Sequence, residues 1–402
     1  MKTKIRILTA TAALFFSAVV AQAQFTAGDL VAVRVGDGTT TLASSGGPIS
    51  LLELNTSGTV IGSPVTIPSG SSGLQISGVA TSEGQLVLNA DHTALTVAGY
   101  VPPFGGSGSL SGRSAANAPR GYATIDYNRT VSAVTTLTGT YSGQNIRSGF
   151  ASGSGLWFTG SGTSSGSGLV YYNGASSSTI QGINSRVLGY YGGSLYYSTG
   201  SGTTGIYKYS GLPTSATTST AFLTGVTGQG TTPYDFALSP DGDTLYVADN
   251  NLGVQKFTFN GSTWTFDYNF TDSAASTDKA YGLAVDFSEA NPILYWTTPT
   301  DIWKATDTGV GAAGTSIFSS GANYAFRGLD FAPEPVPEPS ACALIGLGLA
   351  GLWSCQRRNR KSCTLFFTTR AVITACACFI LPSNSTSSPP SARKARANRP
   401  AG

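Results

Sequence analysis

Apolar and polar residues alternate with a period of two through much of Pro233–Phe259, the spacing that β-strands require. Two turn signals interrupt the alternation, Pro240-Asp241-Gly242 and Asp249-Asn250-Asn251. Proline presets the φ angle of a turn, and glycine and asparagine tolerate φ > 0. The stretch therefore predicts three short antiparallel strands, which is most of a four-stranded blade.

Weaker copies of this strand–turn–strand pattern recur along the chain. Leu86–Gly99 aligns without a gap on Phe236–Asp249. Neighbouring copies lie about 38 to 60 residues apart, in the range typical of propellers and solenoids. No stretch has a convincing helical period, so we predict an all-β protein and, within that class, a β-propeller. The remaining copies are Arg147–Thr159, Ser185–Ser198 and Tyr281–Trp296.

The number of blades follows from the units that can be assigned. Counting the strands gives six, and seven remains possible if the Gly/Ser/Ala-rich insertion at 102–118 hides an extra pair. The last copy, Phe326–Phe331, supplies a first strand with no second. The N-terminal unit has three strands with nothing before them, at Asp29–Val35, Ser50–Asn55 and Val60–Ile67. We therefore expect Phe326–Phe331 to lie beside Asp29–Val35 and to close the ring.

The first 23 residues have the features of a secretory signal. Lys2, Lys4 and Arg6 precede the mostly apolar stretch Ile7–Val20, and Ala21-Gln22-Ala23 suits signal peptidase. We expect export and exclude residues 1–23 from the propeller, which we place at 24–332.

Charge divides the chain into an acidic body and basic ends. Residues 24–340 hold all 20 acidic residues but only 11 of the 23 Lys and Arg, a net charge of −9. They contain no cysteine, so the body has no disulfide framework. Nucleic-acid binding needs clusters of Lys and Arg, and the acidic body argues against it.

Beyond the propeller lies a Pro-rich linker, 333–340, that contains Val336-Pro337-Glu338-Pro339-Ser340. The apolar run Ala341–Trp353 follows, and then a basic cluster with Arg357, Arg358 and Arg360. This order of elements resembles the PEP-CTERM sorting signal of exported bacterial proteins. The resemblance implies a transmembrane sorting helix with its Arg cluster at 341–361, and processing by an exosortase-type enzyme in a Gram-negative envelope that makes exopolysaccharide.

One departure from that family concerns the end of the chain. Family members end within a few residues of the Arg cluster, whereas residues 362–402 follow it here. We interpret this segment as a spurious or disordered extension, or as a genuine tail that would compromise sorting. Cys376 and Cys378 within it are too close together for a standard zinc or redox motif.

Few residues in the sequence suggest a catalytic or ligand-binding role. The single histidine, His92, aligns with Gly242 and is placed in a turn. Asp249, Asn250 and Asn251 either form a turn that satisfies its own backbone or supply oxygen ligands for Ca²⁺, the one cofactor considered. Abundant aromatic residues either pack between blades or stack on sugar rings. These are Trp157, Tyr171, Tyr172, Tyr196, Tyr197, Trp296 and Trp303.

The blades also resemble, more loosely, secreted propellers with NHL-like or lactonase-like repeats, through Ser239–Gly242 and Leu245–Asp249. Such short motifs occur in propellers of unrelated function, so they support the fold alone. Three functions remain open. The first is a non-enzymatic envelope or matrix protein in adhesion or exopolysaccharide association. The second is a metal-dependent propeller hydrolase, lactonase or lyase, which carboxylates converging in the central channel would favour. The third is a matrix component that binds no ligand.

Overall fold

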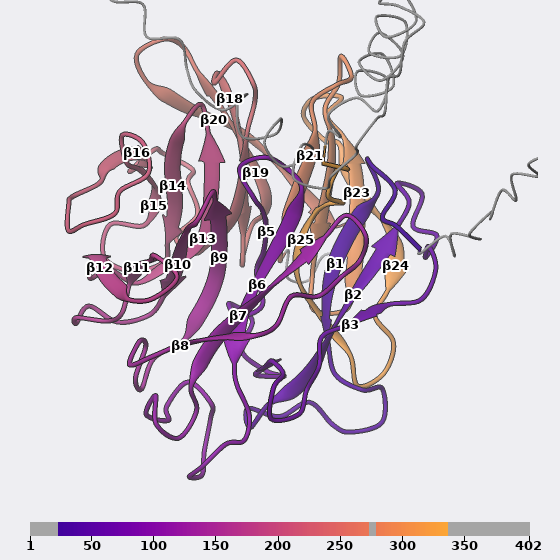
Figure 1. Ribbon diagram of the computed structural model, residues 1–402. Coiled ribbons are helices and arrows are strands. Elements are labelled where there is room, and N and C mark those ends of the chain that lie inside the picture. Colours follow the sequence, from indigo (N-terminus) through magenta and orange to yellow (C-terminus); the bar gives the residue numbers. More distant parts are fainter. Residues whose placement is uncertain (1–22, 273–278, 337–402) are drawn as a thin grey trace, which may run out of the picture. The chain divides into compact units, whose positions relative to one another are not determined.

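The computed structural model describes residues 23–272 and 279–336, and within them every regular element is a strand (Figure 1). The strands group into six four-stranded antiparallel blades. The first three blades, each from its inner to its outer strand, are as follows: β25 (Ala325–Phe331), β1 (Leu30–Val35), β2 (Gly47–Leu54), β3 (Val65–Thr66); β5 (Leu86–Leu88), β6 (Ala94–Tyr100), β7 (Arg120–Asp126), β8 (Thr135–Leu137); β9 (Ile146–Ser152), β10 (Gly155–Gly160), β11 (Leu169–Tyr172), β12 (Ser177–Gln181).

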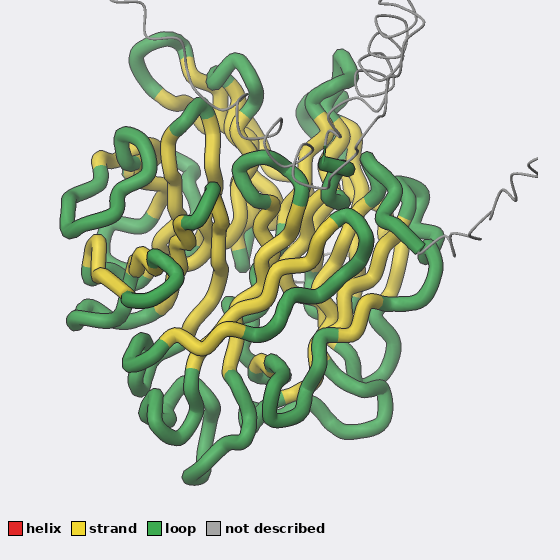
Figure 2. Tube along the Cα trace, in the orientation of Figure 1, coloured by secondary structure: helices red, strands yellow, loops and turns green. Residues whose placement is uncertain are grey.

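The other three blades repeat the same inner-to-outer order. They are β13 (Ser185–Tyr191), β14 (Ser194–Thr199), β15 (Gly205–Lys208), β16 (Thr220–Thr224); β17 (Pro233–Leu238), β18 (Thr244–Asp249), β19 (Gly253–Phe259), β20 (Trp264–Asp272); β21 (Leu283–Asp286), β22 (Ile293–Thr297), β23 (Asp301–Thr306), β24 (Ala313–Ser319). Two further pairings link neighbouring blades. The short β4 (Gln75–Ile76) pairs with both β2 and β6, and the outer strands β20 and β24 pair in parallel. Long loops connect the strands (Figure 2).

The six inner strands form a closed ring. Going round it, β25 neighbours β5, then β9, β13, β17 and β21, which returns to β25. The inner strands run in the same direction, because residue numbers increase together along the hydrogen bonds between neighbouring blades. The N–H of Gln85 donates to the Arg147 carbonyl, and that of Ala90 donates to the Ala151 carbonyl. All inner strands therefore start at one end of the channel and finish at the other.

The predicted closure of the ring is confirmed. β25 pairs antiparallel with β1, with Leu30 opposite Phe331 and Val35 opposite Ala325. The blade is thus built from both ends of the propeller, and its core joins Leu30, Ala32 and Leu52 to Phe326 and Leu329.

The predicted copies are the first two strands of the other five blades. β17 is buried along its whole length, because a neighbouring blade covers each of its faces. Its residues therefore alternate between large and small side chains more clearly than between apolar and polar ones. The insertion at 102–118 contains no strand. Instead the guanidinium of the fully buried Arg120 donates to four carbonyls around it, those of Ser111, Arg113, Ala118 and Gln144. The described residues accordingly form six blades rather than seven.

The predicted secretory signal, sorting helix and extension lie outside the described residues. Within the described part of the chain, no helix is long and apolar enough to cross a membrane.

Candidate functional site at the end of the inner strands

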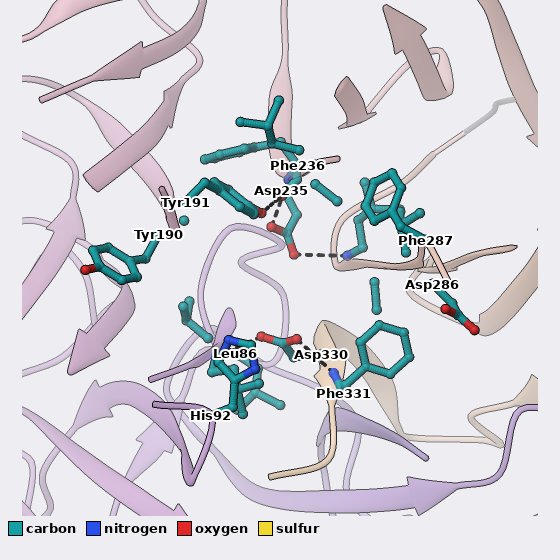
Figure 3. A pocket seen from close by; sticks show the side chains of 18 of the residues that line it. Leu86, His92, Tyr190, Tyr191, Asp235, Phe236, Asp286, Phe287, Asp330 and Phe331 are labelled. Atoms are coloured by element: carbon teal, nitrogen blue, oxygen red, sulfur yellow. Dashed lines mark hydrogen bonds between the residues drawn. The ribbon is translucent and has the colours of Figure 1, made fainter. Parts of the chain in front are cut away.

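A cavity of about 510 Å³ lies where the inner strands finish. Five of the six inner strands contribute to its walls, β5, β13, β17, β21 and β25, together with the loops that follow them. Figure 3 shows Asp235 and Asp330 facing each other across this space, with the rings of Phe287 and Phe331 along one side. Both residues are half-buried and line the cavity.

The two carboxylates are held by the same device. The Asp235 carboxylate accepts the N–H of Leu283 on the next inner strand at 3.0 Å and that of Phe236 at 2.8 Å. The Asp330 carboxylate accepts the N–H of Leu88 on its neighbouring inner strand and that of Phe331, both at 2.8 Å. An inner strand has no ladder partner on its channel side, so its N–H groups need other acceptors. Each carboxylate thus joins two blades and remains at the cavity wall.

Burial changes the protonation of both acids. It raises the pKa of Asp330 from 3.8 to about 6, although the two N–H donors oppose the shift. Burial also raises the pKa of Asp235 well above its usual range, and the nearby Asp330 charge adds to that effect. With a pKa of about 6, Asp330 is mostly ionised at pH 7, where it accepts hydrogen bonds from a ligand, and it can also donate one when it is protonated below that pKa.

His92 occupies the predicted turn, between β5 and β6, with a φ of 61°. It also lines the cavity, beside Asp330 (Figure 3). Its carbonyl oxygen accepts the N–H of Glu334 at 2.7 Å. The alignment with Gly242 therefore located the residue correctly in sequence, but it gave no sign that this turn reaches the channel.

Asp249, Asn250 and Asn251 form a hydrogen-bonded turn at the end of β18. The buried Asp249 carboxylate accepts the N–H of Thr232 at 2.9 Å, the Thr232 hydroxyl at 3.1 Å and the N–H of Asn251 at 2.9 Å. In the described residues no group of three or more His, Cys, Asp and Glu is placed to hold a metal ion. Ca²⁺ binding at Asp249, Asn250 and Asn251 stays a prediction.

Most of the aromatic residues singled out in the sequence pack between blades. Trp296 and Trp303, on neighbouring strands of one blade, stack with ring centroids 6.3 Å apart and pack against Tyr246 and Phe270 of the preceding blade. Tyr171 alone is half-buried, against Trp157 at 5.1 Å. The rings that face the cavity, Phe287 and Phe331, were not singled out. In the sequence, the feature that these two phenylalanines share is a position at the end of an inner strand or just beyond it. Of the aromatic residues singled out in the sequence, the ones buried between blades are Trp157, Tyr172, Tyr196, Tyr197, Trp296 and Trp303.

The chain leaves the propeller beside this cavity. Ala332 and Glu334 line it, and the N–H of Ala332 donates to the Asp29 carbonyl at 2.8 Å. Val336, the first residue of the predicted sorting motif, is 66% exposed. The other predicted motif residues lie outside the described part of the chain: Pro337, Glu338, Pro339, Ser340, Arg357, Arg358 and Arg360.

Residues 335–358 match the family model of the PEP-CTERM protein-sorting motif. The chain is thus a six-bladed β-propeller followed by a PEP-CTERM sorting motif, and this motif implies an exported protein processed by an exosortase-type enzyme. No curated protein matches the chain.

Solved structures similar to this one include three bacterial proteins. A putative 6-phosphogluconolactonase from Bacteroides fragilis is 15% identical, over 76% of this chain and 98% of its own, with a TM-score of 0.40. A protein from Lactobacillus plantarum is 13% identical over 76% and 86%, with a TM-score of 0.44. An auxiliary nutrient binding protein from Bacteroides thetaiotaomicron is 13% identical over 75% and 83%, with a TM-score of 0.41. The fold assignment stands on the strand order described above, and no activity is carried over from these proteins.

Proposed function

We propose that this chain is an exported cell-envelope protein whose propeller is delivered to the outer envelope or matrix by sorting and binds a saccharide in its cavity without turning it over. The sorting part rests on the match at 335–358. Charge supports it, because the body 24–340 carries −9 whereas Arg357, Arg358 and Arg360 follow the apolar run. Basic residues favour the cytoplasmic flank of a membrane segment.

The binding part rests on the cavity wall. Aromatic rings stack on the apolar faces of sugar rings, and carboxyl groups hydrogen-bond to hydroxyl groups. Phe287 and Phe331 supply the first kind of contact, and Asp235 and Asp330 supply the second. Among the residues that the structure describes, no Lys or Arg lines the cavity, which favours a neutral saccharide over an acidic one.

Two substitutions test saccharide binding. Phe287→Ala and Phe331→Ala should each weaken the binding of neutral oligosaccharides by up to about tenfold, because each removes one stacking face. Titration calorimetry with a panel of such oligosaccharides gives the readout. Tyr324→Ala, a half-buried aromatic residue outside the cavity, is the matched control. A wild-type protein that binds no member of the panel would refute this part of the proposal.

A separate test addresses sorting. Replacing Pro337, Glu338 and Pro339 together by alanine should retain the protein in the inner-membrane fraction, because the exosortase-type enzyme loses its recognition sequence. Glu334→Ala, one residue before the matched segment, is the control and should fractionate as wild type. Unchanged fractionation of the triple variant would show that the motif is not used.

The second candidate is a propeller hydrolase, lactonase or lyase. One observation favours it: two buried carboxyl groups converge on the cavity, and the pKa of Asp330 near 6 suits a general acid or base. Turnover of lactone substrates, with and without added Ca²⁺, that is lost in Asp330→Asn would establish this function in place of simple binding.

A further inference from the structure

The opposite end of the channel, where the inner strands start, carries two neighbouring arginines. Arg147 is the second residue of β9 and Arg186 the second residue of β13, so they occupy matching places in neighbouring blades. Arg147 is buried at 8% exposure, and Arg186 is half-buried. Neither residue lines the cavity described above.

Each guanidinium uses only one of its nitrogens. Nη1 of Arg147 donates to the Asn184 side-chain oxygen and to the Ser185 carbonyl at 2.7 Å. Nη1 of Arg186 donates to the Pro233 carbonyl at 3.0 Å. Nε of both arginines is buried without an acceptor, and none of the hydrogen bonds among the described residues involves Nη2 of either. The Nε–Nη2 edge of each guanidinium, a two-donor fork, therefore has no acceptor among the described residues, and its Nε is buried.

Among the described residues, Glu83 and Asp249 act on these charges through space, but no carboxylate forms an ion pair with either arginine. The ion pairs within the described residues are Arg129–Glu53 and Lys256–Asp307, and neither includes Arg147 or Arg186. Burial, and then the charge of Arg186, lowers the pKa of Arg147 to about 10. Buried charges are normally paired, so two adjacent unpaired guanidiniums call for an anion.

The two nearest acids are already engaged. Glu83 accepts the Tyr100 hydroxyl at 2.7 Å, the Asn145 amide at 2.5 Å and the Ser77 N–H at 2.9 Å. The Asp249 carboxylate is taken up by Thr232 and Asn251, as described above. These acids are therefore occupied by other donors and leave the two forks unpaired.

Arg186 is held in place as a binding group would be. Its guanidinium carbon lies 4.3 Å from the centroid of the Tyr234 ring. On Gly200, a Cβ atom would come within 2.3 Å of that carbon, so only glycine leaves room for the side chain. Arg327, by contrast, donates from Nε, Nη1 and Nη2 to the carbonyls of Ala80, Phe326 and Gly78. Arg327 is fully used in holding the ring together, whereas Arg147 and Arg186 each keep a fork unused.

We propose that Arg147 and Arg186 form a binding site for an oxyanion, a carboxylate or phosphate group, at the end of the channel opposite the cavity. Nη2 of each guanidinium can donate a charge-assisted hydrogen bond to either group. The anion belongs either to an acidic sugar or to a phosphate ester, and the two sources are separated by experiment.

The test is titration of the purified chain with sodium glucuronate and with inorganic phosphate, at constant ionic strength set by chloride. Binding is followed by calorimetry and by the rise in Tm that a native-state ligand produces. Arg186→Lys keeps the charge but loses the fork, and Gly200→Ala displaces Arg186. Each should weaken binding about tenfold or more, the effect of one lost charge-assisted contact. Arg34→Lys is the control, because Arg34 also stacks on a tyrosine, Tyr324, at 4.0 Å.

Binding of glucuronate alone identifies an acidic sugar, and binding of phosphate alone identifies a phosphate ester. Either result supports the site. No binding of either anion, or an equal loss in Arg34→Lys and Arg186→Lys, would overturn it. Phe331→Ala should leave anion binding intact, so failure of the saccharide site and failure of this site are distinguishable. If the arginine variants do not fold, the Nε–H NMR signals of the wild-type protein answer instead: added anion should shift two of them.

Discussion

The two ends of the inner strands are built from the same repeats but differ in chemistry. Where the strands start, glycines bring backbones into contact: a Cβ on Gly328 would lie 2.2 Å from the Leu86 nitrogen, and one on Gly282 would lie 2.3 Å from the Leu329 nitrogen. Where the strands finish, Phe287 and Phe331 stand around open space with Asp235 and Asp330 between them. Close backbone packing holds the ring together at the end that carries Arg147 and Arg186, and the other end opens into the cavity.

This comparison predicts that removing the closing strand has the largest effect. Deletion of Phe326–Phe331 takes away the inner strand of the closing blade and exposes the edges of β1, β5 and β21. Cooperative thermal unfolding should be lost. A chain truncated after Lys361 is the control and should unfold at the wild-type temperature. A deletion variant with the wild-type Tm would contradict ring closure by β25.

A single methyl group at the packed end should also be severe. Gly328→Ala forces backbone apart at the contact between β25 and β5, and we expect a loss of about 3 kcal/mol in the free energy of unfolding. Gly70→Ala is the matched control, because nothing lies within 4 Å of a Cβ there. Urea denaturation measures both. Equal stability of the two variants would show that the inner strands tolerate separation.

At the cavity end the expected effect depends on pH. The pKa of Asp330 is raised from 3.8 to about 6, so the folded state retains a proton that the unfolded state loses. Native stability should therefore fall between about pH 4 and pH 6, by at most about 3 kcal/mol. The difference between wild type and Asp330→Asn, measured by urea denaturation at several pH values, should show this decline.

Asp91→Asn supplies a control of opposite sign. The Thr93 hydroxyl, at 2.6 Å, lowers the pKa of Asp91. Asp91 thus contributes stability that is present above pH 4 and lost as the pH falls, and the variant should lack that contribution. If Asp330→Asn and Asp91→Asn changed the pH dependence in the same direction, the burial argument for Asp330 would be wrong.

The smallest effect should come from the cavity wall itself. Phe331→Ala should cost about 1 kcal/mol, since its ring is half-buried and its removal enlarges a space that already exists. Phe326→Ala, on the same strand but fully buried at the packed end, should cost about 3 to 5 kcal/mol. Similar losses for the two variants, compared by thermal unfolding, would erase the distinction between the two ends.

Much of the architecture could be predicted from the sequence. Strand alternation and turn residues are local signals, so the copies at Leu86–Gly99 and Phe236–Asp249 were located correctly. The matching deficits at the two ends of the body predicted the pairing of β25 with β1. The choice between six and seven blades stayed open because nothing local distinguishes a strand pair from the loop around Arg120.

The candidate sites could not be predicted in the same way. Asp235 and Asp330 are 95 residues apart in sequence and meet only because two inner strands finish at the same end of the ring. Arg147 and Arg186 stand at matching places in two repeats, a signal that the alignment of the copies contains. Whether these arginines form ion pairs depends on which donors already bind Glu83 and Asp249. Only the folded structure shows those donors.

The most direct test of the account is the mass of the exported protein, measured intact from cells with and without the exosortase-type enzyme. We predict a mature C-terminus near Pro339 only when the enzyme is present, with the propeller released from the apolar run and the Arg cluster. An intact chain ending at Gly402 in both strains would contradict it, and would identify residues 362–402 as the segment to remove before the measurement is repeated.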